Sequence, residues 1–461
     1  MLAIFALFYR TKVSGTASSN LGVTFTFGFE AGGSFNYTIL TTTATSLLIG
    51  WVNMTEYDKL IEHQKSKPLY DVCLQTSAFD RNSKMLNELS PNGANSSFIG
   101  TIDTKGVYYA YFLGCTKTSF SITFEVFARN PNTLLDYRWD PFFQISYFCI
   151  GAFVVVVIVW LYNWFTHFNI QVTIHHLFLI TVTLTLGKKI TRHFSMNKMK
   201  SVDGFTLEYL IDSIVFSLYD FVFYSALVLA SKGYNIVKND IETKEKIKCY
   251  VYGLLFVIIQ GVMYNVDSAS PIVVLMLFAF FGLVFFYIRE VLKSIENATN
   301  YILAHLISIA NSGIDPKSTP IYHKYKIYES FKFAVALFFS LQILDLFLFG
   351  FSFIQFWASE LSTDIIELIF VIMLYTTFRL SNNETNGYLL IETINNDSYC
   401  LKDIQGISVD GIETRKGSVK WHEGMVLPGP PTLIKSPVAL SIDDQEEDTE
   451  EVSIKPDKND I

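Results

Sequence analysis

The sequence predicts a membrane protein with an N-terminal antiparallel β-sandwich ectodomain, a seven-helix transmembrane bundle and a disordered acidic tail. Half of the 461 residues are hydrophobic, which is more than a water-soluble domain of this length needs. Early residues alternate between apolar and polar, and later ones form stretches of about 20 predominantly apolar residues. The predicted boundaries are 1–11 for an apolar start, 12–140 for the β domain, 141–380 for the helices and 381–461 for the tail.

The apolar start, residues 1–11, is too short to span a bilayer. It resembles the end of a signal peptide, which a protein with a translocated N-terminus needs. The alternative is a buried first strand of the β domain.

Residues 12–140 carry the pattern of β-strands. Apolar side chains alternate with polar ones over 23–30 and again over 120–126. Pairs of turn-forming residues, at 32–33 and 92–93, separate such runs. We therefore predict an antiparallel β-sandwich of about 130 residues, a length that is sufficient for a hydrophobic core of its own.

Two features favour a lumenal or extracellular β domain. Cys73 and Cys115 are the two cysteines that precede the first apolar span, and in an oxidising compartment we expect them to form a disulfide. Two buried free thiols are the alternative. Sequons at Asn36, Asn53 and Asn95 would each place a glycan on the lumenal surface.

Seven stretches are predicted to span the membrane. They cover 142–165, 172–186, 209–230, 250–265, 271–288, 333–357 and 361–380. The second contains several threonines and begins with His175 and His176, so a re-entrant segment is the alternative there. With the β domain outside, seven spans place the C-terminus in the cytosol. Lys188, Lys189 and Arg192 would then lie outside, in the loop that follows the second span.

Four acidic residues inside predicted spans are the candidate intramembrane polar site: Asp212, Asp220, Asp345 and Glu367. Ionisable groups at membrane depth need a partner or water. Asp212 and Asp220 share one broad helix face, about 80 degrees apart. No basic residue is predicted at matching depth, so we expect either neutral acids, or a water cavity, cation or ligand that stabilises their charge. The alternative is that these acids form interhelical hydrogen bonds with neighbouring serine or glutamine side chains and only fix packing.

No pattern of residues predicts catalysis, a cofactor or a metal site. The last predicted span contains no histidine, and the sequence has neither a Gly-x-Ser-x-Gly elbow nor a His-Glu-x-x-His motif. Adjacent residues such as His175 and His176 point about 100 degrees apart on a helix and cannot readily share a metal ion. We therefore predict a protein that is not an enzyme.

The tail beyond residue 380 is polar and contains an acidic run at 443–451, which supplies much of the net charge of −8. We predict that it is disordered. It either docks a cytosolic signalling or sorting protein or serves as a solvated tail. No basic surface interleaved with aromatic residues is apparent in the sequence, so we expect no nucleic-acid partner.

Four local stretches resemble the intimal-thickness-related receptor family, a branch of the Golgi-dynamics-domain seven-transmembrane superfamily. They are KVSGTASS at 12–19, FEVFARNPN at 124–132, HFSMNKMKSVDG at 193–204 and KGYNIV at 232–237. The chain differs at Tyr234, where the family usually has a tryptophan, although an aromatic residue is kept. The resemblance implies that the pair Cys73 and Cys115 is the family's ectodomain bridge, and that the apolar start is the remnant of a signal peptide.

The resemblance also implies a function. It suggests a receptor-like protein with a rhodopsin-like membrane region, G-protein-coupled signalling and, in some members, a response to pheromone. The residues themselves do not support G-protein coupling, because an Asp-Arg-Tyr triplet and an Asn-Pro-x-x-Tyr motif are missing from the third and seventh spans. The alternative is a cargo or sorting factor of the Golgi and endosomes with a lumenal binding domain. The expected partners are the bilayer and an unidentified ligand or cargo, at the plasma membrane or in Golgi and endosomal membranes.

Overall fold

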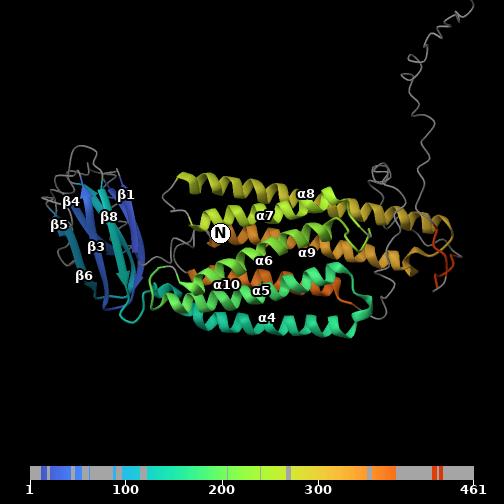
Figure 1. Cartoon of the computed structure of the whole chain (residues 1–461), viewed down its shortest axis with the longest axis horizontal. Coiled ribbons are helices and arrows are strands. Elements are labelled where there is room, and N and C mark those ends of the chain that lie inside the picture. Colours follow the sequence, from blue (N-terminus) through green and yellow to red (C-terminus); the bar gives the residue numbers. More distant parts are fainter. Residues whose placement is uncertain are drawn as a thin grey trace, which may run out of the picture.

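In a computed structural model of the chain, the strands lie at one end of an elongated molecule and the helices run side by side along its length (Figure 1). The structure describes residues 12–17, 21–42, 47–53, 55, 62, 87–89, 96–114, 122–204, 206–238, 240–265, 271–349, 356–380, 418–422 and 425–428. The predicted cysteine pair Cys73 and Cys115, the sequon at Asn95 and the apolar start lie outside these residues.

The N-terminal region contains two four-stranded antiparallel sheets, ordered β1-β8-β3-β6 and β2-β7-β4-β5. The strands are β1 Lys12–Ala17, β2 Leu21–Phe29, β3 Gly33–Thr42, β4 Leu47–Asn53, β5 Asn87–Leu89, β6 Ser96–Ile102, β7 Gly106–Gly114 and β8 Ile122–Arg129. Burial alternates along β8, as the period of a half-buried strand requires. The predicted antiparallel strands are confirmed in this region.

Aromatic side chains from both sheets form one hydrophobic cluster. Trp51 on β4 is fully buried, and its ring centroid lies 5.0 Å from that of Phe29 on β2 and 5.5 Å from that of Phe35 on β3. Because β3 belongs to the other sheet, Trp51 bridges the two sheets through ring contacts, a favourable arrangement for buried aromatic residues.

Hydrogen bonds tie the β region to the first long helix. Asn130 accepts a bond from Glu30 N at 2.6 Å and donates to Gly28 O at 3.1 Å and to Leu135 O at 2.8 Å. Gly28 N donates to Asp136 Oδ2 at 2.7 Å. These bonds satisfy buried backbone groups at the junction and so hold the β region against the start of the helices.

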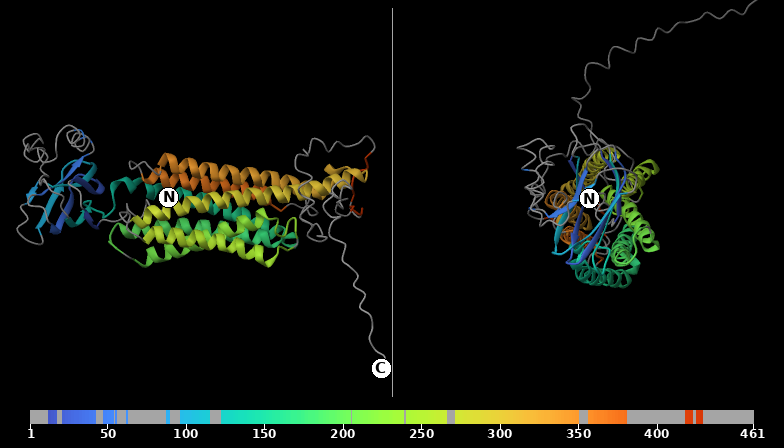
Figure 2. Two further views of the ribbon diagram at one scale, coloured as in Figure 1. Left: turned by 90° about the horizontal axis from the view of Figure 1, so that it is seen from above. Right: turned by 90° about the vertical axis from the view of Figure 1, so that its left-hand side faces the viewer.

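Seven long helices are found in the described part of the chain. They are α4 Asp140–Thr166, α5 Thr173–Met199, α6 Leu207–Ser231, α7 Thr243–Asn265, α8 Pro271–Asn311, α9 Pro320–Phe349 and α10 Phe356–Phe378, with short 3-10 turns η1 Tyr137–Trp139, η2 Phe168–Ile170 and η3 Pro316–Ser318. Figure 2 shows them packed around one another. Their outer surfaces expose large apolar side chains, among them Phe148, Tyr162, Phe278 and Phe285. Such a surface suits lipid rather than water.

Five of these helices are long and apolar enough to cross a bilayer: α4, α6, α8, α9 and α10. They indicate a multi-pass membrane protein. The helices α5 and α7 are more polar, because α5 contains three basic residues near its middle and α7 begins with a charged segment. The prediction of seven spans is therefore met by five helices.

The predicted end of the second span is wrong. The apolar stretch ends at residue 186, which predicts that Lys188, Lys189 and Arg192 lie in an outside loop. Instead α5 continues without a break to Met199, and these three side chains point into the bundle, where acidic residues of α10 and α6 receive them. The alternative of a re-entrant segment is also wrong, because α5 is a single uninterrupted helix.

The end of the bundle that lies away from the β region, here called the far end, contains the α6–α7 and α8–α9 connections. The 41 residues of α8 extend for about 60 Å, roughly twice the thickness of a hydrocarbon core, so this helix projects beyond its neighbours at the far end (Figure 1). After α6 the chain turns at Gly233, whose φ of +86° favours glycine. A Cβ there would lie 2.9 Å from Val237 Cβ, so the tight turn also excludes a side chain.

One part of the predicted disordered tail is bound to the far end. Val419 N donates to Gly313 O at 3.0 Å, and Asp315 N donates to Val419 O at 2.9 Å, forming a parallel bridge between Ile314 and Val419. Trp421 N donates to Ser318 Oγ at 2.8 Å. The prediction of disorder is wrong for 418–422, because this segment of the tail forms hydrogen bonds with the α8–α9 loop.

Candidate functional site

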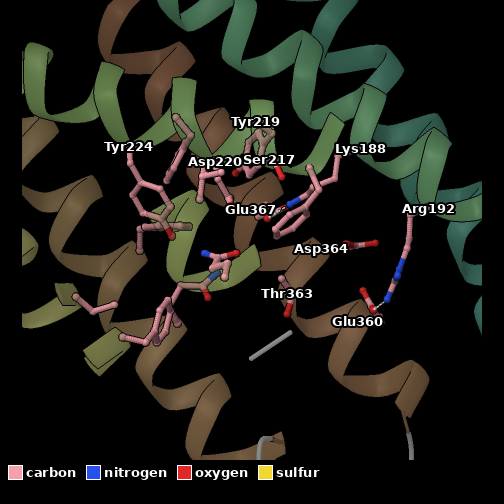
Figure 3. Close-up of a pocket in the computed structure, with 18 of the residues that line it drawn as sticks. Lys188, Arg192, Ser217, Tyr219, Asp220, Tyr224, Glu360, Thr363, Asp364 and Glu367 are labelled. Carbon is pink, nitrogen blue, oxygen red and sulfur yellow. Dashed lines mark hydrogen bonds and ion pairs between the residues drawn. The ribbon is translucent and has the colours of Figure 1, made fainter. Parts of the chain in front are cut away.

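A cavity of about 480 Å³ lies among all seven long helices, from α4 to α10 (Figure 3). Five acidic side chains line it, Asp212, Asp220, Glu360, Asp364 and Glu367, together with three basic ones, Lys188, Lys189 and Arg192. Such a concentration of charge is costly inside an apolar helical bundle unless the charges are paired or solvated. The cavity is therefore the candidate functional site.

The deeper part of the cavity contains an ion-pair cluster between α5 and α10. Lys188 Nζ lies 2.5 Å from Glu367 Oε1, and Lys189 Nζ lies 2.7 Å from Glu367 Oε2. Lys189 also pairs with Asp364. Lys188 Nζ lies in addition 4.1 Å from the ring centroid of Tyr219, a favourable cation–π distance. Each base thus has a carboxylate partner, as a buried charge requires.

A second cluster lies closer to the β region. Arg192 NH2 is 2.9 Å from Glu360 Oε1, and Arg192 NH1 is 3.6 Å from Asp212 Oδ2. Thr191 Oγ1 donates to Asp212 Oδ1 at 2.9 Å. Arg192 and Asp212 are close to the ends of α5 and α6 that adjoin the β region, and Glu360 is in the first turns of α10. The charged lining thus extends from this end of the bundle toward its middle.

Asp220 differs from the other acids of the cavity. It lies midway along α6 and is only 4% exposed. Its Oδ2 atom has no hydrogen-bond partner among the described residues, and no described basic side chain forms an ion pair with it. In Figure 3 it lies beside Glu367 and Tyr219. An unpaired buried carboxylate oxygen needs a further explanation, such as a ligand or water.

The structure brings three of the four predicted acids to the cavity. Asp212, Asp220 and Glu367 line it, whereas Asp345 is buried next to it and accepts a hydrogen bond from Thr363 at 3.3 Å. Asp212 bonds to Thr191, and Asp345 bonds to Thr363 and Ser362, so both acids form interhelical hydrogen bonds of the kind expected in the packing alternative. The expectation that no basic residue lies at matching depth is wrong, because the span that carries the bases was predicted too short.

Sequence reasoning also missed Glu360 and Asp364. With Glu367 they follow the spacing i, i+4, i+7, which places all three on one face of a helix. Lys188 and Arg192 are likewise four residues apart. Matching the acidic face of one helix to the basic face of another would have suggested the clusters.

The two described sequons lie on the β region. Asn53 is the last residue of β4, and its Oδ1 accepts a hydrogen bond from Thr55 Oγ1 at 2.7 Å. Asn36 is on β3, and Thr38 Oγ1 donates to its Oδ1 at 3.3 Å. No group of His, Cys, Asp or Glu side chains in the described ranges is arranged to hold a metal ion.

No protein-family model and no curated protein matched the chain. The geometry of the cavity therefore carries the functional argument. Paired charges line its wall, Asp220 presents an acceptor without a partner in the described part of the chain, and aromatic rings such as those of Tyr219 and Tyr224 supply apolar surface. A cavity with this lining can hold a small molecule and orient it through a few polar contacts.

Proposed function

We propose that this chain is a receptor-like membrane protein of seven spans, with a β-sandwich ectodomain outside and its tail in the cytosol, that binds a ligand in the cavity and transmits binding to the cytosolic end. The observation that carries the proposal is the 480 Å³ cavity lined by paired charges and by Asp220. Its volume lies within the usual range for small-molecule sites. Five helices are long and apolar enough to cross a bilayer. The helices α5 and α7 pack beside these five and would complete the seven spans (Figure 1).

A connection between the cavity and the far end supports transmission. Asp220 and Ala230 belong to the same helix, α6, and Tyr328 on α9 donates to Ala230 O at 2.9 Å. Lys324 on α9 donates to Ile236 O, in the turn after α6, at 2.6 Å. A ligand that displaced α6 would therefore shift contacts that hold the α6–α7 loop. Differential contacts of this kind are what a ligand needs to change a conformational equilibrium.

Filling the cavity tests this function without knowledge of the ligand. Ser217 lines the cavity, whereas Leu218, the next residue on α6, is 48% exposed on the outside of the bundle. We expect Ser217→Trp to change hydrogen exchange over residues 232–248 at the far end, because the indole occupies the ligand's space. Leu218→Trp is the matched control and should leave exchange there unchanged. Equal effects of the two variants would contradict the proposal.

The cellular location separates the receptor from the cargo or sorting factor. A receptor for an external ligand should be labelled at the cell surface by a membrane-impermeant reagent at steady state. Retention in the Golgi together with altered secretion on loss of the protein would instead indicate the sorting role.

A further inference from the structure

Two acceptor atoms of lining residues have neither a hydrogen bond nor an ion pair among the described residues, whereas Glu367 Oε2 lacks a hydrogen bond but pairs with Lys189. They are Asp220 Oδ2 on α6 and Gln260 Oε1 on α7. Both atoms are buried, and a carboxylate oxygen and an amide oxygen can only accept hydrogen bonds. Leaving either unpaired costs free energy. The neighbouring helices α6 and α7 thus each offer an acceptor to a hydrogen-bond donor of a ligand in the cavity.

The charges that line the cavity indicate the charge of the ligand group that carries this donor. Three bases serve four of the acids, since Lys188 and Lys189 pair with Glu367 and Asp364, and Arg192 with Asp212 and Glu360. Asp220, the fifth acid, is left over. A cation in the cavity would pair with Asp220 and reduce the surplus of negative charge, which has a high energy in a low-dielectric bundle.

The rest of the lining favours an organic cation over a metal ion. Aromatic rings line the same cavity as the acceptors, among them Phe216, Tyr219, Phe223, Tyr224, Phe338 and Phe339. Aromatic faces attract ammonium groups and cover apolar bodies. The described residues offer no cluster of side chains that could hold a metal ion. An amine with an apolar body satisfies both the acceptors and the rings.

We propose that the cavity binds a ligand through a primary ammonium group, with Asp220 as its counter-ion and Gln260 as an acceptor of a further N–H bond. The inference rests on the proposed function in one respect, that the cavity is a ligand site. A primary ammonium has three N–H donors, whereas a quaternary ammonium has none and cannot satisfy these oxygens.

Such a group has two sources, a free amine or the headgroup of an aminophospholipid. Phe281, Phe285 and Ile343 line the cavity and are also 41%, 64% and 44% exposed on the bundle surface, so the cavity reaches the side that faces lipid. The shared chemistry is the primary ammonium. Separate arms of the experiment distinguish the sources.

The free-amine arm uses the purified full chain in detergent micelles and a series of three probes. These are 2-phenylethylamine, its N,N,N-trimethyl derivative and 2-phenylethanol, which has a hydroxyl in place of the ammonium. The lipid arm uses phosphatidylcholine nanodiscs with and without phosphatidylethanolamine, and native mass spectrometry measures which lipid stays bound. We expect a preference for the primary amine, or for phosphatidylethanolamine over phosphatidylcholine, of about tenfold or more, the range for a charge-assisted hydrogen bond.

Two variants assign the preference to the acceptors. Asp220→Asn should abolish it, because the amide removes the counter-charge. Gln260→Met is nearly isosteric and leaves no buried charge. It should weaken the preference for the primary ammonium, which keeps the test valid if Asp220→Asn fails to fold. Glu208→Gln removes a carboxylate of α6 outside the cavity and should leave it unchanged.

The outcomes separate this inference from the proposed function. No preference for the primary ammonium in either arm, or a preference that survives both Asp220→Asn and Gln260→Met, would overturn the ammonium site while the cavity could still bind a ligand of another class. An ammonium preference that depends on Asp220, without any change in hydrogen exchange at 232–248, would support the site and contradict the receptor function.

Discussion

Lys188 Nζ on α5 lies 2.5 Å from Glu367 Oε1 on α10, although 179 residues separate the two in the chain. Without this contact Lys188 would be a buried charge without a carboxylate partner. Since Glu367 also receives Lys189 at 2.7 Å, this carboxylate is the centre of the cluster. The unequal number of partners of Lys188 and Glu367 makes their substitutions distinguishable.

Glu367→Gln should destabilise the fold more than Lys188→Met. The first change leaves Lys188 buried without its carboxylate, at a cost of about 3 kcal/mol, whereas after the second change Lys189 still pairs with Glu367. The double variant should be more stable than Glu367→Gln alone, because it leaves neither charge behind. Thermal unfolding in detergent micelles measures the order, with the exposed Lys198→Met as the control. Simple additivity of the two changes would contradict this coupling.

Asn130→Ala should loosen the junction between the β region and α4. The side chain of Asn130 bonds to three backbone groups, Glu30 N, Gly28 O and Leu135 O, and its loss should cost about 2 kcal/mol or more. Faster proteolytic cleavage within residues 122–136 would report the loss. Asn132→Ala, at an exposed position two residues away, should have no such effect.

The far end should contribute an acid-sensitive component of stability. Glu245 Oε2 lies 2.7 Å from Lys232 Nζ and Oε1 lies 2.5 Å from Lys248 Nζ, and these hydrogen bonds lower the pKa of Glu245 from 4.5 to about 2. Because the folded pKa is below the unfolded value, the stabilisation is complete above pH 4.5 and is lost as the pH falls toward 2. The difference in unfolding free energy between the native chain and Glu245→Gln should shrink over that range.

Lys232→Met provides the check on this assignment. Lys232→Met removes one of the two hydrogen bonds that lower the pKa of Glu245. In that background, the stability difference caused by Glu245→Gln should therefore depend less on pH. The pKa of Lys232 is itself raised by bonds to Glu245 and Glu290, which offset its partial burial. The contribution of the protonated Lys232 to stability should therefore be fully present below its ordinary pKa of 10.5. It should disappear as the pH rises through the raised pKa of the folded state.

Val419→Pro should release the tail from the α8–α9 loop. Proline has no N–H to donate to Gly313 O, so the bridge at Ile314 loses one of its two hydrogen bonds. Hydrogen exchange at 313–318 should become faster. Val426→Pro is the matched control, because Val426 is 89% exposed and outside the bridge. Exchange that is unchanged in Val419→Pro would show that the contact does not persist in solution.

The sequence by itself determined the elements. The alternation at 23–30 and 120–126 predicted strands that the structure shows as β2 and β8, and predominantly apolar stretches located α4, α6 and α10 closely. These features depend on local periodicity, which a single stretch of chain reveals. The boundaries of α5 and α9 were harder to predict, since charged turns continue both helices beyond their apolar stretches.

Only the tertiary structure decided which charges meet. Glu360, Asp364 and Glu367 could be assigned to one helix face from their spacing, but their partners on α5 are more than 160 residues away. The same holds for the cavity, which side chains of seven helices enclose. It also holds for Asp220 Oδ2, because its lack of a partner among the described residues depends on all of its neighbours. Periodicity along one helix describes a face, whereas the free energy of a buried charge depends on every group packed around it.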